Sequence, residues 1–305
     1  MNAIFDGQRL ASFCSDVRQH PFDATRDVVA YLDLQKQYAG SRWTTAATQF
    51  RDYPLHGLLL EDPYTQRAFR KPRGYAGDAV MMDFLYGHPS VADMVDGASD
   101  IGRRICRFSA CDSDPARAVR WRRRRVAVEI EAMVEARGHI EVFAFASGHL
   151  REFELLPPDI RGRVRFVAAD ADEVSLAGIG TSYGRKAVEC SHTSIKQLLM
   201  GRARKLGKFD FAYTLGLLDY VTGRAAGRVV ECLWDLIRPS GAVLAANFTR
   251  ATRGSAYMEA AMDWWLQYRS RDEVSEWARS LYGLNACEVF EDPYQQIAYL
   301  LARKG

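Results

Sequence analysis

The chain has 305 residues, of which 48% are hydrophobic and 26% are charged, as is ordinary for a soluble globular protein. Its formal net charge of +3 indicates no general polyanion partner, and no stretch of 18 apolar residues predicts a membrane span. No basic segment followed by an apolar one opens the chain, so we expect no signal peptide and a cytoplasmic protein. The six cysteines and six histidines are scattered, which favours reduced thiols and no metal site.

The first 60 residues favour helices, because apolar residues recur at helical spacing and the pairs Tyr53-Pro54 and Asp62-Pro63 interrupt them. A loop of unusual composition follows at 67–78, where two glycines and a proline lie among basic residues, a tyrosine and an acid. Loops of this chemistry often hold ligands, and the alternative is a solvated basic turn. We expect residues 1–115 to form a helical N-terminal cap or substrate-binding region.

Residues 91–137 predict further helices and contain a run of arginines at 117–125 that suggests nucleic-acid binding. Three glutamates offset this charge, and the same helix continues with an apolar face. Trp121 is the one aromatic residue interleaved with the arginines, so few side chains could stack on bases. We therefore favour an amphipathic helix and expect no nucleic-acid partner.

From residue 139 onward the periodicity changes to alternating strands and helices. Ile140–Phe145 and Val164–Ala169 predict two strands, and the small residues Ala146-Ser147-Gly148 make a tight turn after the first. Asp170 ends the second strand, 22 residues after Gly148. In a nucleotide-binding βαβ unit, such a turn lets a ligand approach the backbone and such an acid accepts hydrogen bonds from ribose hydroxyls.

The turn contains a single glycine, whereas a dinucleotide site needs several so that a pyrophosphate can lie against bare backbone. It also lacks the Lys-Ser/Thr pair of a P-loop. A ribose-bearing ligand without phosphate fits this turn better, and S-adenosylmethionine (SAM) is the common one. The alternative is a purely structural α/β connection.

The rest of the chain predicts three more strands at 187–190, 209–214 and 242–247, alternating with helices, and then a hairpin at 286–300. This order predicts an α/β fold in residues 116–305, a doubly wound sheet with an antiparallel terminal hairpin. In such sheets a ligand lies across the carboxyl ends of the strands, near the switch point. That rule brings together the segments 146–149, 170–172, 191–194, 214–216 and 247–248.

The loop Lys71–Asp78 reads K-P-R-G-Y-A-G-D, and with Phe209–Tyr213, Leu217–Tyr220 and Ala246–Phe248 it resembles class I SAM-dependent methyltransferases. The similarity is greatest to a bacterial group with a helical N-terminal region that carries a K-P-x-G-Y-A-G-D loop. Some members of this group are described as making the methyl ester of 3-hydroxypalmitic acid, a quorum signal. The resemblance covers residues 60–302, and the loop is specific for the group and not for the substrate.

The resemblance implies a Rossmann-like methyltransferase domain, a helical N-terminal cap and SAM as cofactor. The residues it assigns to SAM are Ala146, Ser147, Gly148 and His149 for the methionine part, Asp170 for the ribose, Ala171, Asp172, Ser194 and Ile195 for the adenine, and Thr214, Leu215 and Gly216 for the sulfonium side. The chain departs from the superfamily pattern at His149, where many members have a second glycine.

Methyl transfer needs an acceptor held close to the methyl group, and a hydroxyl or ammonium acceptor also needs a base. We predict Tyr75, Asp78 and His192 as catalytic residues, with His149 and Asp219 as further candidate bases. Arginine can clamp a carboxylate with two hydrogen bonds, so the basic loop suggests recognition of an anion. This anion is the acceptor carboxylate, an anchoring carboxylate on the substrate, or the carboxylate of SAM itself. The predicted substrate-binding residues are Arg73, Tyr75, Asn247, Trp264 and Tyr268, although the tryptophan could equally belong to the core.

The leading prediction is a small-molecule methyltransferase that O-methylates a carboxylate-bearing hydroxy acid or fatty acid in bacterial secondary metabolism or signal biosynthesis. N- or S-methylation of an amino-acid-like substrate anchored by its carboxylate is the alternative within this class. An RNA methyltransferase and a non-catalytic SAM-binding protein are the alternatives from other classes. We expect no membrane partner, and a homodimer remains open.

Overall fold

The computed structural model describes residues 4–184 and 186–305, and the chain forms two compact units. The first unit comprises Met1–Arg120 and Thr252–Trp265, and the second comprises Trp121–Ala251 and Leu266–Gly305. The sequence-based division after residue 115 lies close to the first boundary. Because the predicted sheet domain ran without interruption from 116, it did not anticipate that 252–265 belongs to the N-terminal unit.

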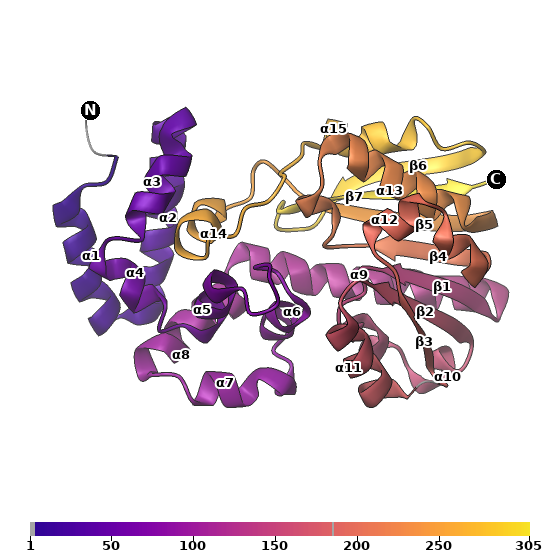
Figure 1. Ribbon diagram of the computed structural model, residues 1–305, viewed down its shortest axis with the longest axis horizontal. Coiled ribbons are helices and arrows are strands. Elements are labelled where there is room, and N and C mark those ends of the chain that lie inside the picture. The colour runs from indigo at the N-terminus through magenta and orange to yellow at the C-terminus, as the bar shows by residue number, and fades with distance from the viewer. Residues whose placement is uncertain (1–3, 185) are drawn as a thin grey trace. The chain divides into compact units, whose positions relative to one another are not determined.

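The first unit is helical (Figure 1). Pro54 and Pro63, expected to interrupt helices, stand at first helical positions, where the missing N–H has no partner to lose. The helices in chain order are α1 (Gly7–Gln19), α2 (Pro21–Ala39), η1 (Gly40–Arg42), α3 (Trp43–Phe50), α4 (Pro54–Leu59), α5 (Pro63–Arg70), α6 (Ala79–Tyr86), η2 (Pro89–Val91), α7 (Ala92–Asp96), α8 (Asp100–Cys106), η3 (Arg107–Asp112) and, from the returning segment, α14 (Ser255–Ala261).

The second unit is a seven-stranded sheet with helices along its connections (Figure 1). Helix α9 (Asp114–Arg137) begins in the first unit and leads into the sheet. The elements that follow are β1 (Ile140–Phe145), η4 (Arg151–Leu155), α10 (Pro158–Arg161), β2 (Val164–Asp170), α11 (Glu173–Tyr183), β3 (Val188–His192), α12 (Ile195–Leu199), η5 (Arg202–Leu206), β4 (Phe209–Thr214), η6 (Leu218–Tyr220), α13 (Gly223–Asp235), β5 (Ile237–Phe248), α15 (Arg271–Ser275), η7 (Glu276–Ala278), β6 (Leu284–Glu291) and β7 (Ile297–Lys304).

The strand order is β3-β2-β1-β4-β5-β7-β6. Strands β1 to β5 pair in parallel, whereas β7 pairs antiparallel with both β5 and β6. This confirms the predicted α/β fold, a doubly wound sheet ending in an antiparallel hairpin, together with a helical N-terminal region. The order reverses between β1 and β4, so the crevice expected at a switch point lies at the carboxyl ends of these two strands.

The central strands are short apolar runs because they are covered on both faces. Phe143 on β1 and Phe209 on β4 stack with ring centroids 5.0 Å apart and belong to a core cluster that includes Val229, Val230 and Leu233 of α13. Burying side chains of this size contributes about 1.5–3 kcal/mol each. The sheet is therefore a rigid support for the loops that leave its carboxyl edge.

Three connections are irregular. The segment after the β1 turn is the 3-10 segment η4, and Pro158 begins α10. Helix α14 ends at Ala261, and Asp263 follows with φ 50°. Gly241 lies within β5 near an irregularity in its pairing with β4, where a Cβ would come within 2.6 Å of the Asp210 carbonyl oxygen.

Candidate functional site

The turn after β1 adopts an uncommon backbone conformation. Ala146, Gly148 and Leu150 all have positive φ, between 53° and 54°. A residue other than glycine costs about 1–2 kcal/mol in this region, so two of the three positions are strained. The Ser147 N–H donates to the Ala169 carbonyl oxygen at 3.2 Å and holds the turn against β2. Leu150 is thus a second position of this turn, after Ala146, where a residue other than glycine has the left-handed conformation.

Asp170 ties this turn to the end of β2. Its Oδ2 accepts from the Gly148 N–H at 2.8 Å, and its Oδ1 accepts from the Asp172 N–H at 2.9 Å. A carboxylate has about four acceptor positions, so two stay available on these oxygens. Asp172 also caps α11, accepting from the Val174 N–H at 3.0 Å. The acid and the glycine, 22 residues apart in sequence, are therefore directly bonded, and the acid can still accept ribose hydroxyls.

Two hydroxyl groups near the switch point are buried without a partner among the described residues. They are the Ser147 Oγ, two residues beyond β1, and the Thr214 Oγ1, at the last position of β4. Strands β1 and β4 are neighbours, with Ala144 opposite Tyr213. Leaving a buried polar group unpaired costs about 1–3 kcal/mol, and such groups in a native fold call for an explanation. A polar ligand at the ends of β1 and β4 would satisfy both.

Arg122 is a buried residue of the site that the sequence did not single out. Its side chain is only 4% exposed, and its Nη1 donates to the Leu215 carbonyl oxygen at 2.6 Å. The arginine run was interpreted as a charged helix face. Arg122 nevertheless precedes Val126, Ile130 and Val134, all buried, in steps of four residues. That spacing would have placed Arg122 on the buried face of α9.

Glu152 is a second buried charge that sequence reasoning missed. It accepts a hydrogen bond from the Tyr213 hydroxyl on β4. Burial raises the pKa of the Glu152 carboxyl, and the nearby guanidinium groups of Arg122 and Arg123 act in the opposite direction. The segment after the β1 turn is thus bonded to β4 through one buried side chain, on which two arginines of α9 act electrostatically.

Asp219 anchors the loop that follows β4. It is 2% exposed, and its Oδ1 accepts from the Phe248 N–H at 2.7 Å. Burial raises the pKa of its carboxyl to about 6, while Arg122 and Arg269 oppose this shift. Among the candidate bases of the sequence analysis, Asp219 therefore combines burial at the carboxyl edge with a pKa close to working pH.

Asn247, predicted to bind substrate, lies at the end of β5 in a buried hydrogen-bond network. Its Nδ2 donates to the carbonyl oxygens of Phe248 and Gln267, at 2.9 and 2.8 Å, and its Oδ1 accepts from Arg269. Arg269 also donates to the carbonyl oxygens of Leu218, at 2.7 Å, and Val221. These contacts join the ends of β4 and β5, and a substrate-binding role for Asn247 stays a prediction.

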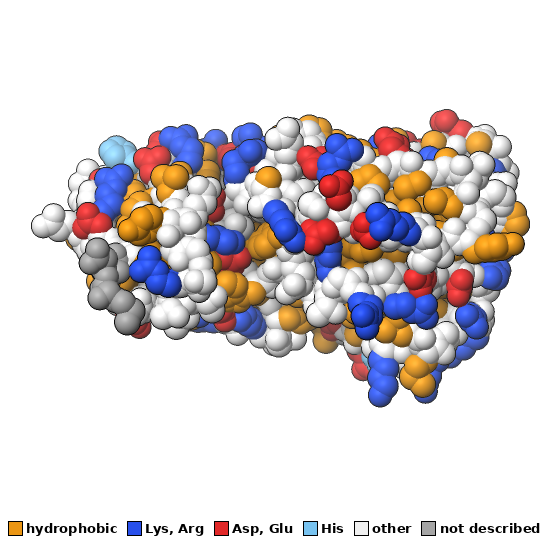
Figure 2. All heavy atoms as spheres, turned by 90° about the horizontal axis from the view of Figure 1, so that it is seen from above, with side chains coloured by type: hydrophobic (Ala, Val, Ile, Leu, Met, Phe, Trp, Pro, Cys, Tyr) orange, Lys and Arg blue, Asp and Glu red, His pale blue; other side chains and the backbone are white. Residues whose placement is uncertain are grey.

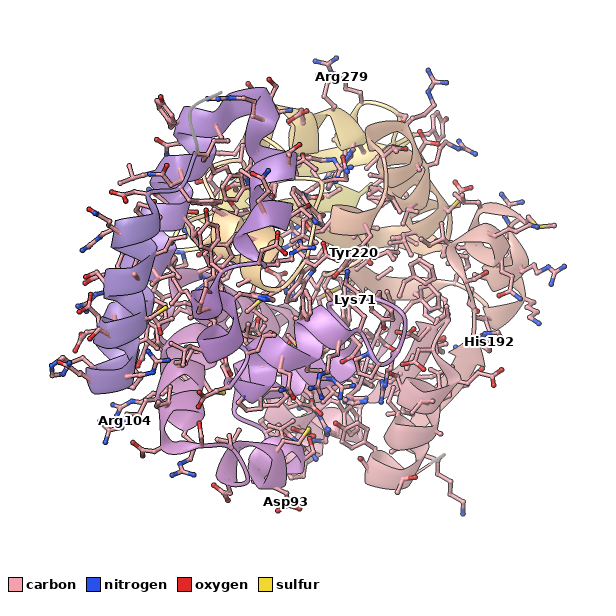
Figure 3. The ribbon with its side chains drawn as sticks, turned by 60° about the vertical axis from the view of Figure 1, so that its left-hand side comes forward. Lys71, Asp93, Arg104, His192, Tyr220 and Arg279 are labelled. Carbon is pink, nitrogen blue, oxygen red and sulfur yellow. The ribbon has the colours of Figure 1, made fainter. Side chains whose placement is uncertain are left out.

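The predicted adenine-side residues lie at the β2–β3 end of the sheet. Ala171 follows β2, and Ser194 caps α12 in a capping box with Gln197. His192 ends β3, half exposed, with its Nε2 3.2 Å from the Ala171 carbonyl oxygen (Figure 3). Because β3 lies three strands from β4 and strands are about 4.8 Å apart, this position does not favour catalysis by His192, which stays a prediction.

The K-P-R-G-Y-A-G-D loop belongs to the first unit, and two of its charged residues have structural partners there. Asp78 is buried, caps α6 through the Met81 N–H at 3.0 Å, and accepts two hydrogen bonds from Arg67, at 3.1 and 2.6 Å. Lys71, with φ 49°, forms an ion pair with Asp263. Arg73 is half-buried and Tyr75 is 39% exposed. Catalytic roles for Tyr75 and Asp78 stay predictions.

The aromatic residues at 264–268 have different surroundings. Trp264 is buried, and its backbone N–H donates to the Met258 carbonyl oxygen at 2.8 Å. Trp265 is exposed, and its Nε1 donates to the Asp263 carboxylate at 2.9 Å. Tyr268 is half-buried in the second unit. Trp264 fits the core-packing interpretation, and substrate binding by Trp264 and Tyr268 stays a prediction.

Several residues of the arginine run make contacts inside the protein. Arg120 donates to the Leu85 and Ala110 carbonyl oxygens at 2.8 and 3.1 Å, and Arg125 pairs with Glu129. On the face shown in Figure 2, Lys and Arg side chains are interspersed with Asp and Glu. Neither observation favours a nucleic-acid surface.

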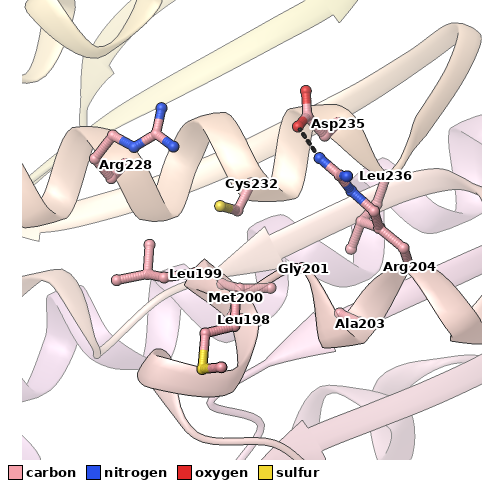
Figure 4. Close-up of a pocket in the computed structure, with 10 residues that line it drawn as sticks. All are labelled: Leu198, Leu199, Met200, Gly201, Ala203, Arg204, Arg228, Cys232, Asp235 and Leu236. Atoms are coloured by element: carbon pink, nitrogen blue, oxygen red, sulfur yellow. Dashed lines mark hydrogen bonds and ion pairs between the residues drawn. The ribbon is translucent and has the colours of Figure 1, made fainter.

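A pocket of about 180 Å³ lies elsewhere in the second unit, between α12, η5 and α13 (Figure 4). Cys232 lines it, and Arg204 and Asp235 form an ion pair of 3.2 Å beside it. Burial raises the pKa of the Cys232 thiol, which disfavours the reactive thiolate. Arg204 and Asp235 lie in the connections that lead into β4 and β5, so this pocket is separate from the carboxyl edge.

Within residues 4–184 and 186–305, no group of three or more His, Cys, Asp and Glu side chains could hold a metal ion. None of the helices in the same residues has both the length and the apolar character that crossing a membrane requires.

No protein-family model matches the sequence, and no curated protein matches it. Solved structures do resemble it. One is a possible exported protein from Bordetella parapertussis, with 13% identity and a TM-score of 0.53 over 86% of this chain and 96% of that chain. Another is an O-methyltransferase family protein from Burkholderia thailandensis, with 18% identity and a TM-score of 0.47 over 76% and 72%. The first similarity shows a shared fold over most of both chains.

Proposed function

We propose that the chain is a SAM-dependent methyltransferase whose second unit binds the cofactor. The observation that supports this most is the carboxyl edge of β1, β2 and β4. There a strained turn and a carboxylate bonded to that turn lie at the switch point of a doubly wound sheet. The hydroxyls of Ser147 and Thr214, which have no partner in the part of the chain that the structure describes, lie there too. Strain and unpaired buried groups persist where a ligand compensates for them.

The residues present fit SAM at each of its parts. Asp170 has acceptor capacity left for the ribose hydroxyls, and Ala171, Asp172, Ser194 and Ile195 would border the adenine. Ala146, Ser147, Gly148 and His149 would hold the methionine part, and Thr214, Leu215 and Gly216 the sulfonium side. The turn presents one glycine and no lysine, which suits a ligand without phosphate.

SAM supplies a methyl group on a positively charged sulfur, which is already a good leaving group. The protein must then orient the acceptor and exclude water. These effects can lower the activation free energy of methyl transfer by several kcal/mol. A carboxylate acceptor needs no base. A hydroxyl or ammonium acceptor needs one, and Asp219 is mostly ionised above pH 6 and could take the proton at its carboxylate. Tyr75, Asp78 and His192 remain the other proposed catalytic residues.

For the substrate we propose a small carboxylate-bearing molecule, with O-methylation of a hydroxy acid or fatty acid as the leading reaction. The chemistry of Arg73 and Tyr75 supports it, because a guanidinium group beside a phenol suits a carboxylate. Asn247, Trp264 and Tyr268 are the other proposed substrate residues. N- or S-methylation of an amino-acid-like substrate is the alternative, since a carboxylate would anchor that substrate equally well. Its identity, a bacterial signalling or secondary-metabolite role and a cytoplasmic location remain proposals.

The test begins with calorimetric titration of the purified protein with SAM and with NAD. Mass spectrometry of products from a panel of fatty acids, hydroxy acids and amino acids follows. Binding of SAM and a product heavier by one CH₂ is the expected result, and fragmentation of the product identifies the acceptor atom. Binding of NAD without SAM would overturn the proposal. Binding of SAM without any product, on the panel or on RNA, would favour the non-catalytic alternative.

A further inference from the structure

The connection between β3 and β4, residues 193–208, is strongly basic. It contains five Lys and Arg residues and no Asp or Glu, whereas the whole chain has a formal net charge of +3. The five cations are all exposed: Lys196, Arg202, Arg204, Lys205 and Lys208. Arg204 forms an ion pair with Asp235, but Lys196, Arg202 and Lys205 have no ion pair within the residues that the structure describes. Uncompensated positive charge therefore lies on this surface.

In the first part of this connection, α12 exposes apolar side chains beside a cation. Ile195 and Leu198 pack against the core of the second unit. Lys196, Leu199 and Met200 lie on the outer side, and Leu199 and Met200 are 39% and 61% exposed. Residues three and four apart are neighbours on a helix, so the two apolar side chains flank the lysine. A single exposed apolar residue is ordinary, but here two adjacent ones lie within a basic segment.

In the second part, η5 turns its cations outward for the same reason. Ala203 and Leu206 pack against the core, and residues three apart lie directly above one another in a 3-10 helix. Arg202 and Lys205, also three apart, are therefore held on the opposite, exposed side. Because α12 and η5 are both anchored by buried apolar residues, the cations and the exposed aliphatic side chains belong to one fixed surface.

The apolar side chains of this segment continue into the pocket between α12, η5 and α13 (Figure 4). Leu199 and Met200 line this pocket of about 180 Å³, together with Arg204 and with Arg228 of α13. Guanidinium groups thus lie beside aliphatic side chains. That combination suits a molecule with an anionic group next to an apolar chain, as in a phospholipid.

The composition of 193–208 favours a membrane surface over a nucleic acid. Cations interspersed with exposed aliphatic residues are typical of segments that lie on anionic bilayers. The segment contains no Phe, Tyr or Trp, on which the bases of a single strand could stack.

We propose that residues 193–208 form a docking surface for a bilayer that contains anionic phospholipids. Leu199 and Met200 enter the headgroup region, and the cations pair with lipid phosphates. The sequence analysis expected no membrane partner because no apolar stretch is long enough to span a bilayer, but docking on the surface needs no such stretch. This inference does not depend on the proposed methyl transfer.

The test is co-sedimentation of the full-length protein with vesicles of phosphatidylcholine alone and of equal parts phosphatidylcholine and phosphatidylglycerol. We expect binding to the vesicles with phosphatidylglycerol, and weaker binding at high salt, which screens the charges. Arg202→Gln combined with Lys205→Gln removes two cations and should weaken binding by more than about tenfold. Met200→Ser keeps every charge and should weaken binding severalfold, because a hydroxyl group replaces an apolar one in the headgroup region.

The matched controls come from the first unit. Arg26→Gln combined with Arg104→Gln removes two exposed cations and so changes the net charge equally. Met94→Ser replaces another exposed methionine, 39% of which is accessible. Both controls should keep the full binding of the wild-type protein.

Four results would overturn the proposal. They are no binding to the anionic vesicles, equal binding to both kinds of vesicle, an equal loss in the control variants, and undiminished binding by Met200→Ser, which would indicate adsorption by charge alone. Binding of single-stranded RNA without binding of vesicles would assign the surface to a nucleic acid and would also overturn it. Thermal unfolding verifies that the variants are folded. If the variant at 202 and 205 is not, Lys196→Gln decides, and it should weaken vesicle binding severalfold.

Discussion

The two units differ in how their buried charged and polar groups are hydrogen-bonded. In the first unit, Glu259 accepts from the Lys36 Nζ at 2.8 Å and from the Trp43 Nε1 at 2.6 Å, which ties α14 to α2 and α3. Asp62 in the same unit accepts from the hydroxyls of Thr65 and Ser109, each at 2.7 Å. These buried acids join segments that are far apart in the sequence, and each has at least two donors.

In the second unit, the ends of β1 and β4 differ from these acids. Ser147 and Thr214 have buried hydroxyls with no partner among the described residues, and Ala146 has a left-handed backbone conformation. Satisfied polar groups stabilise a fold, whereas strained or unpaired groups are retained where they serve binding. Polar residues with satisfied hydrogen bonds thus hold the helices together, whereas those with unpaired groups can bind a ligand. In the sequence, both kinds are charged or small residues and cannot be told apart.

The largest effect should come from breaking a satisfied network in the first unit. Glu259→Ala removes the carboxylate that Lys36 and Trp43 share, and Lys36 keeps the Ser255 hydroxyl as an acceptor. Removing one partner of a largely buried ion pair costs about 3–5 kcal/mol. Denaturant unfolding would measure the free energy of unfolding. Glu276→Ala is the control, because the pair of Glu276 with Arg279 is exposed and should contribute less than about 1 kcal/mol. Similar effects of the two changes would contradict the comparison.

A second effect concerns pH and the buried Asp219 of the second unit. Burial raises its pKa from 3.8 to about 6, so the folded state binds the proton more tightly than the unfolded state. The contribution of Asp219 to the free energy of unfolding is therefore largest below pH 3.8, decreases as pH rises toward 6, and is constant above it. The total decrease is about 3 kcal/mol. Asp219→Asn should remove this part of the pH dependence.

Thermal or denaturant unfolding of the wild-type protein and of Asp219→Asn between pH 4 and pH 7.5 would measure this pH dependence of the free energy of unfolding. The variant should gain stability relative to the wild-type protein as pH rises through this window. Parallel profiles would show that Asp219 does not titrate in the window, and they would also weaken its assignment as a base.

The third effect concerns ligand binding. Asp170→Asn keeps the size of the side chain but replaces one acceptor oxygen by an NH₂ group, which would face a backbone N–H of Gly148 or Asp172. We expect the binding free energy of SAM to weaken by about 1.5–3 kcal/mol. Calorimetry measures this, with the exposed Asp159→Asn as control. Unchanged SAM affinity in folded Asp170→Asn would remove Asp170 from the proposed cofactor site.

The smallest effect tests the strain in the turn. Ala146→Gly should stabilise the protein by about 0.5–1 kcal/mol, because glycine adopts φ 54° without steric cost but loses more entropy on folding. Ala144→Gly, two residues earlier in β1, should be destabilising because that backbone is extended and buried. Unfolding midpoints measure both changes. Destabilisation at both positions would show that the turn stores no strain.

Local sequence patterns were sufficient to predict the central strands. Strands β1 and β4 have the predicted bounds, Ile140–Phe145 and Phe209–Thr214, because each is an apolar run bounded by small or polar residues. The same rule put Asp170 and Thr214 at strand ends, where the structure has them. The apolar residues of 257–268 belong to a short helix and an irregular segment, which helical spacing does not distinguish.

The sequence by itself determined the fold class, the order of strands and helices, and the glycine turn and acid that suggest a cofactor, because these features depend on neighbours along the chain. Only the tertiary structure decided the partner of each charged side chain. Arg122 meets the Leu215 carbonyl oxygen 93 residues away, and Lys36 meets Glu259 223 residues away. Helical spacing shows which face of a helix is buried. The groups that contact this face depend on how distant segments pack. Only this packing shows whether a buried charged side chain is part of a structural ion pair or is a candidate binding residue.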